Sequence, residues 1–479
     1  MFKKFRIPLL ALCLLVGIAI AAVLAADLLG GTADESRLPH SDVADSSYVD
    51  FTTSEISGTA SHESAGQSTA QSSTGMQTAT MSAGTGHAVS SSAENSKLDA
   101  SAPAASAVSP GGAGDAAGPQ TAESLLHSMT LFEKIGQLFI VRPEALNYNL
   151  SSHTANSAPG GLKAVNSDTA AMLQRYPVGG VCFFGANIAA PAQLTAFTGG
   201  LQKQSKVPLF IAVDEEGGRV ARVANTEGFS VPTFESMLAI GATGDTNNAY
   251  HVGATIGGYL KTYGFNLDFA PVADVFTNPQ NTVIGDRAFG SDPHLVARMV
   301  TAEIRGLHDA GIMSAIKHFP GHGDTSDDTH AGTVMVDKTW EQLKQCELIP
   351  FTAGFASTDM VMISHITTPK ITTDGLPASL SREMLTDRLR GELGYTGVIV
   401  TDSLEMKAIT ANYSAADAAV KAFSAGADIL LLPGDLISAY NGVYNAVTNG
   451  TISEQRLDES VLRILRWKLE RGIIAARTE

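Results

Sequence analysis

The stretch SAIKHFPGHGDTSDDTH, residues 314–330, begins as a short apolar run and continues as a loop rich in histidine, aspartate and glycine. A short apolar run bounded by glycine and proline is typical of a strand buried in a parallel sheet. Seven further runs of this kind are spread along the chain: QLFIV (137–141), GGVCFF (179–184), PLFIAV (208–213), NLDFAPV (266–272), MVMISH (360–365), GVIVTD (397–402) and DILLLP (428–433). The sequence therefore predicts eight short buried strands.

Amphipathic segments that fit helices lie between these runs, and the clearest span residues 248–264, 293–311, 414–427 and 453–472. Strands that alternate with helices predict an α/β fold with a parallel sheet. Eight strand and helix pairs are the number that closes a (β/α)8 TIM-type barrel. We therefore predict that residues 119–479 form a single domain with this fold.

Two segments of different composition precede the predicted domain. Residues 1–26 carry Lys3, Lys4 and Arg6 and then run apolar to Ala26, which predicts a signal peptide or a signal anchor. Residues 27–118 are mostly serine, alanine, threonine and glycine, so they cannot bury enough apolar area to offset the entropy of ordering. We expect a disordered linker that holds an extracytoplasmic domain, either anchored in the membrane at the cell surface or secreted.

The charge of the chain excludes one class of partner. The formal net charge is -16, and the linker alone has eleven acidic residues against two basic ones. A nucleic-acid-binding surface needs a basic stripe that neutralises phosphates, and the sequence offers none. We therefore expect no nucleic acid among the partners.

Polar residues stand at the ends of five of the predicted strands or in the loops that follow them. The segments are DEEGGRVAR from Asp214, IGDRAFG around Arg287, the loop from Lys317, SHIT around His365 and TDSLEM around Asp402. Acidic residues and glycines also terminate strands and cap helices for structural reasons alone. In a barrel, however, the carboxyl ends of all strands meet at one rim, where active sites are built. The sequence therefore predicts one polar site at this rim.

A metal site is one interpretation of the loop at 317–330. His318, His322, Asp324 and His330 offer nitrogen and oxygen ligands. The HExxH pattern and a neighbouring cysteine are missing, and Lys317 would repel a cation. We therefore expect neither a metal nor an organic cofactor.

Several motifs together resemble those of a known family. KHFPGHGDTSDDTH, VDEEGGRVAR, VIGDRAFG, ELIPF and VTDSLEM are similar to the catalytic domain of glycoside hydrolase family 3, in its beta-N-acetylglucosaminidase branch. The resemblance covers residues 119–475, and the motifs stand in the family's order. It implies a retaining mechanism in which Asp402 is the nucleophile and His330, paired with Asp328, is the acid/base.

The chemistry of these residue types fits the implied roles. Retaining hydrolysis forms a covalent glycosyl-enzyme, which needs an ionised carboxylate such as that of Asp402. The second group must give and take a proton near neutral pH, and an unperturbed histidine does so. In an extended Asp328-Thr329-His330 segment the outer side chains share a face, so the carboxylate can orient the imidazole. By itself, this tripeptide also fits a turn.

The resemblance further implies a pocket for the terminal N-acetylglucosamine, lined by Asp214, Arg222, Arg287, Lys317 and His318. A carboxylate accepts hydrogen bonds from sugar hydroxyls, and cationic side chains donate to others.

Three further polar residues in these motifs have interpretations without sugar contact. His322 is expected to hold the PGHG loop, and His365 fits a supporting role behind the site. Arg219 fits an ion pair with its neighbours Glu215 and Glu216.

The sequence and the resemblance together predict an enzyme, a glycoside hydrolase of the beta-N-acetylhexosaminidase type. It would remove non-reducing terminal N-acetylglucosamine from cell-wall muropeptides or related glycans, acting as a monomer. A beta-glucosidase of the same family is an alternative, although those enzymes generally take their acid/base from a second domain. A phosphorylase is another, since a histidine acid/base does not repel phosphate. The alternative in which the protein is not an enzyme is a wall-binding module that binds the glycan without turnover.

Overall fold

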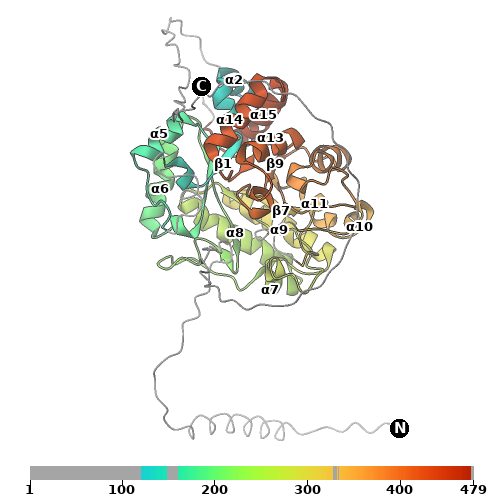
Figure 1. Ribbon diagram of the computed structural model, residues 1–479. Coiled ribbons are helices and arrows are strands. Elements are labelled where there is room, and N and C mark those ends of the chain that lie inside the picture. The colour runs from blue at the N-terminus through green and yellow to red at the C-terminus, as the bar shows by residue number, and fades with distance from the viewer. Residues whose placement is uncertain (1–119, 148–159, 327–331, 333, 476–479) are drawn as a thin grey trace, which may run out of the picture. The chain divides into compact units, whose positions relative to one another are not determined.

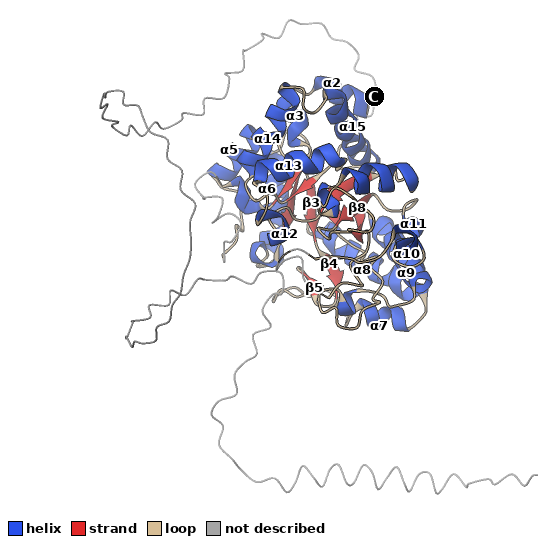
Figure 2. Cartoon of the chain, turned by 45° about the vertical axis from the view of Figure 1, so that its right-hand side comes forward, coloured by secondary structure: helices blue, strands red, loops and turns tan. Residues whose placement is uncertain are grey.

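The computed structural model describes residues 120–147, 160–326, 332 and 334–475, so the expected signal segment and linker lie outside the described ranges. Eight parallel strands form the centre of the domain, and helices surround them (Figures 1 and 2). Each strand overlaps one of the eight predicted apolar runs. The strands are β1 (Phe139–Val141), β2 (Gly180–Phe183), β3 (Phe210–Val213), β6 (Leu267–Asp268), β7 (Met313–Phe319), β8 (Met360–Ile363), β9 (Val398–Thr401) and β10 (Leu430–Leu431).

The sheet closes on itself. Its strand order is β10-β1-β2-β3-β6-β7-β8-β9, and a parallel bridge between Val400 and Ile429 joins the two outer strands. The backbone N–H of Thr401 donates to the carbonyl oxygen of Ile429 at 3.0 Å across this seam. The closed parallel sheet confirms the predicted (β/α)8 barrel. A separate antiparallel hairpin, β4 (Glu215–Gly217) and β5 (Val220–Ala221), follows β3.

Helices of different length connect the strands, and the segments expected from the sequence correspond to α8, α9, α13 and α15. Within the described ranges, no helix is both long and apolar enough to cross a membrane. The α-helices are α2 (Ala122–Ser128), α3 (Leu131–Gly136), α5 (Ser167–Arg175), α6 (Pro191–Gln204), α7 (Met237–Ala242), α8 (Thr246–Thr262), α9 (Pro293–Ala310), α10 (Trp340–Lys344), α11 (Leu348–Gly354), α12 (Lys407–Thr410), α13 (Ala415–Ala425), α14 (Leu436–Thr448) and α15 (Glu454–Glu470). Short 3-10 helices are η1 (Pro143–Leu146), η2 (Gly185–Asn187), η3 (Gly285–Arg287) and η4 (Ala378–Leu380), and η5 (Glu383–Glu392) is a π-helix.

Residues at the two ends of α9 explain where this helix begins and ends. The side chain of Asp292 accepts a hydrogen bond from the backbone N–H of His294, and proline occupies the first helical position. Gly311 ends the helix with a φ of 84°, a conformation that favours glycine. Along the helix, Gly306 allows close packing, because a Cβ atom there would lie 2.2 Å from the carbonyl oxygen of Tyr250 in α8. The two long helices therefore pack with their backbones in contact.

Buried charges hold α15 against the barrel. Asp428, before β10, is fully buried and pairs with Arg463 of α15 at 2.5 Å. Asp359, before β8, is also buried and pairs with Arg471 at 2.7 Å. The buried ammonium of Lys468 donates to the side chain of Gln137 at 2.9 Å and to the carbonyl oxygen of Gly179 at 2.8 Å. Its complete burial lowers the pKa of Lys468 to about 7.

We predict that the contribution of Lys468 to stability depends on pH. The unfolded chain keeps this proton up to a pKa of 10.5, whereas the folded protein releases it near pH 7. Between these values the unfolded state binds more protons, so the free energy of unfolding should rise with pH by about 1.4 kcal/mol per pH unit. Urea unfolding at several pH values measures this slope in the wild type and in Lys468→Met.

The exposed Lys163 provides the control, as Lys163→Met. The difference in unfolding free energy between wild type and Lys468→Met should shift in favour of the wild type as pH rises, while Lys163→Met should follow the wild type. Parallel curves for all three proteins would show that Lys468 stays charged in the fold.

Candidate active site

The candidate site residues that the structure describes belong to different elements of the fold, and they lie at one rim of the barrel. Asp214 follows β3, Lys317 and His318 belong to the end of β7, and Asp402 follows β9. Arg287 ends η3, in the loop after β6. Because parallel strands in a barrel all end at the same side, these side chains share one rim.

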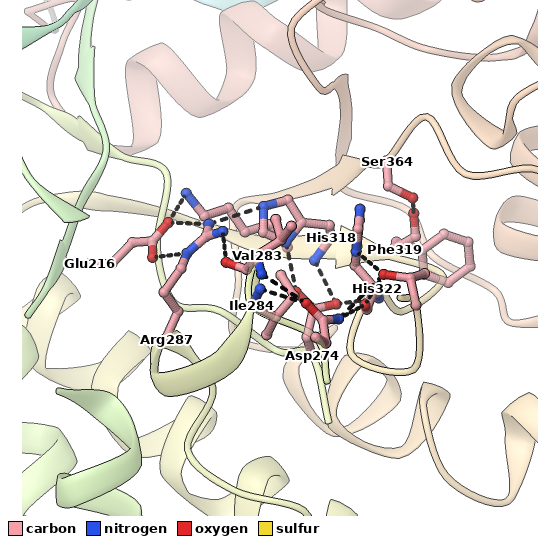
Figure 3. A network of polar contacts seen from close by, with 12 residues as sticks. Glu216, Asp274, Val283, Ile284, Arg287, His318, Phe319, His322 and Ser364 are labelled. Carbon is pink, nitrogen blue, oxygen red and sulfur yellow. Dashed lines mark hydrogen bonds and ion pairs between the residues drawn. The ribbon is translucent and has the colours of Figure 1, made fainter. Parts of the chain in front are cut away.

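Glu216 connects four of the five predicted sugar-binding residues. The Nζ atom of Lys317 lies 2.6 Å from Asp214 Oδ1 and 2.6 Å from Glu216 Oε1. Arg287 binds both carboxylate oxygens of Glu216, each at 2.7 Å, and its Nη2 lies 3.4 Å from His318 Nε2. Figure 3 shows the guanidinium of Arg287 directed at this carboxylate. The four residues thus form one hydrogen-bonded network through a carboxylate that the sequence did not single out for this role.

The electrostatics of the network follow from its pairing. Burial by itself would raise the pKa of Glu216, but the charges of Arg287 and Lys317 hold it well below its usual value. Burial would likewise lower the pKa of Lys317, whereas Asp214 and Glu216 raise it. Glu216, Lys317 and Arg287 are therefore charged over a wide pH range around neutrality.

Asp274 holds His318 from the other side. Its Oδ2 lies 2.6 Å from His318 Nδ1, and its Oδ1 accepts from the backbone N–H of His322 at 2.6 Å (Figure 3). Burial opposes ionisation of this carboxyl, but the nearby His318 and His322 lower the pKa of Asp274. A carboxylate only accepts hydrogen bonds, so we infer that Nδ1 of His318 carries a proton. Its Nε2 atom is then left to face Arg287.

The loop after β7 is held by residues from the loop after β6. The side-chain amide of Asn281 donates to the carbonyl oxygen of His322 at 2.7 Å, and Thr325 Oγ1 lies 2.8 Å from His322 Nδ1. Thr277 donates to Asp324 at 2.9 Å. These contacts agree with the expected role of His322 in supporting the loop. Asp328 and His330 lie outside the described residues.

Two of the side chains considered as possible metal ligands have other partners in the part of the loop that the structure describes. His318 is bound by Asp274, and Asp324 accepts from Thr277 and pairs with Lys338 at 3.2 Å. Over the described ranges, no group of three or more histidine, cysteine, aspartate or glutamate side chains is arranged to hold a metal ion.

Asp402 is half-buried, directly after β9. Its backbone N–H donates to the carbonyl oxygen of Ile363 in β8 at 2.8 Å, and its Oδ1 accepts from the N–H of Ser403 at 2.7 Å. His365 is buried behind this turn, with Nε2 at 2.7 Å from the carbonyl oxygen of Ser403. Burial lowers the pKa of His322, and the charge of Asp402 opposes this shift. Asp402 therefore stands at the carboxyl end of β9, on the same rim as Lys317 and His318 at the end of β7.

Arg222 also belongs to this end of the barrel. It follows β5, and it is half-buried. Burial raises the pKa of the Cys182 thiol in β2; the charge of Asp214 raises it further, whereas Arg222 and Lys317 lower it. The charge of Arg142 lowers this pKa as well, so Arg222 is one of four charged side chains that act on the thiol.

The interpretation of Arg219 as a partner of Glu215 and Glu216 was wrong. Arg219 pairs with Asp286 at 2.7 Å and donates to the carbonyl oxygen of Val283 at 2.6 Å. It stands at the turn of the β4 and β5 hairpin, whereas Glu215 and Glu216 are buried. Proximity in sequence did not predict the pairing, because a hairpin turn and its strand present side chains to different surroundings.

Sequence reasoning also missed two functional neighbours, Glu216 and Asp274. Glu216 stands two residues after Asp214 in the DEEGG motif, and Asp274 follows the NLDFAPV run by two residues. An acidic residue just beyond a predicted strand was the available signal in both cases. Nothing local in the sequence indicated which cation or imidazole each would face.

The chain is similar to known proteins over the whole barrel. A family model described as "Glycosyl hydrolase family 3 N terminal domain" matches residues 130–467. Beta-hexosaminidase A of Pseudoalteromonas piscicida is 36% identical over 327 residues, which cover 62% of this chain and 54% of that protein. A beta-hexosaminidase of Stenotrophomonas maltophilia is 36% identical over 269 residues, covering 54% of this chain and 77% of that protein.

Among solved structures, the fold is similar to that of a glycoside hydrolase family 3 beta-N-acetylglucosaminidase from Paenibacillus. The TM-score is 0.67 at 38% identity, with 74% of this chain and 64% of that chain covered. The chain thus spans about half the length of the Pseudoalteromonas relative and less than two thirds of the Paenibacillus one. Because the family model matches well over half of the sequence, from α3 to α15, the chain belongs to glycosyl hydrolase family 3.

Proposed function

We propose that this chain is a retaining exo-beta-N-acetylglucosaminidase that hydrolyses terminal, non-reducing N-acetylglucosamine from glycans. The observation that carries the proposal is the network of Asp214, Lys317, Glu216 and Arg287 at the same rim as Asp402. It combines hydrogen-bond donors and acceptors for a polar sugar with a carboxylate able to act as a nucleophile. Membership in the family and the names of the similar proteins support the same activity.

In the proposed first step, a carboxylate oxygen of Asp402 attacks the anomeric carbon. The bond between that carbon and the leaving oxygen breaks, and His330 gives its proton to the leaving group. A covalent glycosyl-enzyme results. Water then attacks the anomeric carbon and returns a proton to His330, which releases the sugar and restores Asp402.

The proposed sugar site has defined donors and acceptors. The side chain of Asp214 is 21% exposed, so it is accessible to sugar hydroxyls that donate hydrogen bonds. Lys317 and Arg222 are proposed as donors, with His318 beside them. Asp328 is proposed to orient the imidazole of His330 and to stabilise its cation.

The proposed activity is tested by hydrolysis of a chromogenic beta-N-acetylglucosaminide. Release of the chromophore with free N-acetylglucosamine supports the proposal. Formation of the sugar 1-phosphate in phosphate buffer would instead identify a phosphorylase, and preference for the beta-glucoside would identify a glucosidase. Binding of N-acetylglucosamine without turnover would indicate a binding module.

We also propose that the natural substrates are cell-wall muropeptides or related glycans, and that the domain, residues 119–479, acts outside the cytoplasm. The supporting observation is the composition of residues 1–26 and 27–118, which is typical of a targeting segment and a linker.

We predict that deletion of residues 1–118 moves the activity to the cytoplasm and leaves it undiminished. The full-length chain should place the activity in the membrane fraction if residues 1–26 are retained, or in the medium if they are cleaved. Cell fractionation with the chromogenic assay distinguishes these outcomes. Cytoplasmic activity of the full-length chain, or an inactive truncated protein, would contradict the proposal.

We predict that Asp402→Ala lowers kcat by about 10³-fold or more and leaves thermal stability nearly unchanged. The reason is that a half-buried carboxylate at the rim supplies chemistry and not core packing. Asp387→Ala, at an exposed aspartate of η5, is the matched control and should keep wild-type kcat. An Asp402→Ala variant with more than a few per cent of wild-type kcat would exclude Asp402 as the nucleophile.

We predict that His330→Ala loses about 10²- to 10⁴-fold in rate on a substrate with a poor leaving group. The loss should shrink for an activated aryl leaving group, because that group departs without protonation. Asp328→Ala should show a milder defect with the same dependence. Single-turnover kinetics on both substrates measure the glycosylation step.

The exposed His294 gives the control His294→Ala, which should match the wild type on both substrates. Equal losses of His330→Ala on good and poor leaving groups would leave His330 as a binding residue. Inhibition of the wild type by a chelator, reversed by zinc, would favour the metal interpretation of the loop.

A further inference from the structure

Several acidic side chains are buried in this part of the protein, and three of them have different surroundings. Glu216, Asp268 and Glu303 are each at most 1% exposed. Glu216 binds Arg287 through both oxygens and Lys317 through one. In the described part of the chain, by contrast, Asp268 Oδ2 and Glu303 Oε2 are buried without a hydrogen-bond partner. The three carboxyl groups therefore differ in how far the fold compensates a negative charge.

This difference decides which of the three is ionised. Asp268 Oδ1 accepts from the backbone N–H of Glu215 at 2.9 Å, but within the described residues neither Asp268 nor Glu303 forms an ion pair with a cation. A buried carboxylate with so little compensation is strongly unfavourable, so such a group stays protonated. Burial accordingly raises the pKa of Asp268 and of Glu303 well above the usual range. Glu216 alone of the three has two cationic partners, and it is the one that carries the negative charge.

The polar groups around Glu216 form a connected chain, and its first four members, Asp214, Lys317, Glu216 and Arg287, alternate in sign. It runs from Asp214 to Lys317, Glu216, Arg287, His318 and Asp274, and each neighbouring pair is in contact. The side chains of Asp214 and Arg287 are 21% and 12% exposed, whereas those of Glu216 and Lys317 are 1% and 2% exposed. Glu216 stands in the middle of the chain and away from solvent.

We propose that Glu216 is a positioning residue for the sugar site, because its carboxylate holds Lys317 and Arg287 in place without itself touching the substrate. The inference rests on the proposed function. Lys317 has three N–H donors, of which Asp214 and Glu216 engage two. Arg287, held by both oxygens of Glu216, keeps its Nη2 near His318. One hidden carboxylate thus sets the direction of two cations at once.

The consequence of removing this charge follows from the same contacts. Glu216→Gln offers one acceptor oxygen where two cations are bound, and its amide nitrogen is a donor that faces a donor. Lys317 then depends on Asp214 alone, and Arg287 loses its bidentate partner. Sugar binding should weaken, so KM should rise by about 10- to 100-fold, with a smaller change in kcat.

A second effect separates positioning from general structural damage. The groups that face Lys317 are Asp214 and Glu216 on the hairpin side, Arg287 of η3, Asp268 of β6 and Glu303 of α9. Since Asp214 and Glu216 raise the pKa of Lys317, loss of one of them lowers it. The alkaline limb of N-acetylglucosamine binding, measured as its inhibition constant over pH, should therefore move to lower pH in Glu216→Gln.

The experiment compares four proteins: the wild type, Glu216→Gln, Glu216→Asp and the matched control Glu303→Gln. The control changes a buried carboxyl that also faces Lys317 but is uncharged, so KM and the alkaline limb should stay within about two-fold and a few tenths of a pH unit of the wild type. Glu216→Asp keeps the charge on a shorter side chain. It should raise KM but leave the alkaline limb near that of the wild type.

The outcomes distinguish the two proposals. A wild type that does not hydrolyse the chromogenic substrate contradicts the proposed function. If the wild type is active but Glu216→Gln and Glu303→Gln behave alike, the positioning role of Glu216 is wrong and the proposed function stands. If Glu216→Gln does not fold, Glu216→Asp decides: a raised KM with an unshifted alkaline limb supports the positioning role, and unchanged KM overturns it.

Discussion

Closure of the parallel sheet is the constraint on which the site depends. β10 must pair with β1 on one side and with β9 on the other, and Leu430 and Leu432 donate to Leu138 and Ile140 at 2.7 and 2.8 Å to do so. Once the ring is closed, all eight strands end at the same rim. Residues 214, 317 and 402 are thereby brought together although long stretches of chain separate them. Helix α15 packs at the opposite end of the barrel.

Charged groups are buried at both ends of the barrel, and the two ends use them differently. At the end opposite the rim, Asp428 and Asp359 pair with arginines of α15 and of the segment that follows it. At the rim, Glu216 pairs with Lys317 and Arg287, which stand beside the proposed sugar site. A buried ion pair adds little net stability but is costly to break. The ion pairs of Asp428 and Asp359 fix how α15 docks on the barrel. The ion pairs of Glu216 fix the orientation of the side chains beside the proposed sugar site.

The rim gives rigid support to the loop that carries the proposed acid/base. His318 and His322 are tied to Asp274, and Asn281 holds the loop after β7 at the carbonyl of His322. Asp402 is held through backbone and side-chain bonds to its own turn and to β8. The proposed nucleophile and three of the proposed sugar-binding residues, Asp214, Lys317 and His318, therefore stand at strand ends whose positions the barrel sets. This arrangement suits a reaction that requires a carboxylate and a proton donor on opposite sides of one sugar bond.

The sequence by itself determined the eight strands, the principal helices and several of the residues at the rim, but not Glu216 or Asp274. Short apolar runs and helical periodicity are local signals, and the confirmed strand at 313–319 needs only its own residues to be recognised. The motifs also singled out Asp214, Lys317 and Arg287. Only the tertiary structure decided their partners: Lys317 meets Asp214 across 103 positions, and Arg287 meets Glu216 across 71. Arg219, close to Glu216 in sequence, pairs elsewhere. The physical reason is that a charge is paired by whichever group the closed barrel places within hydrogen-bond distance, and sequence separation carries no information about that distance.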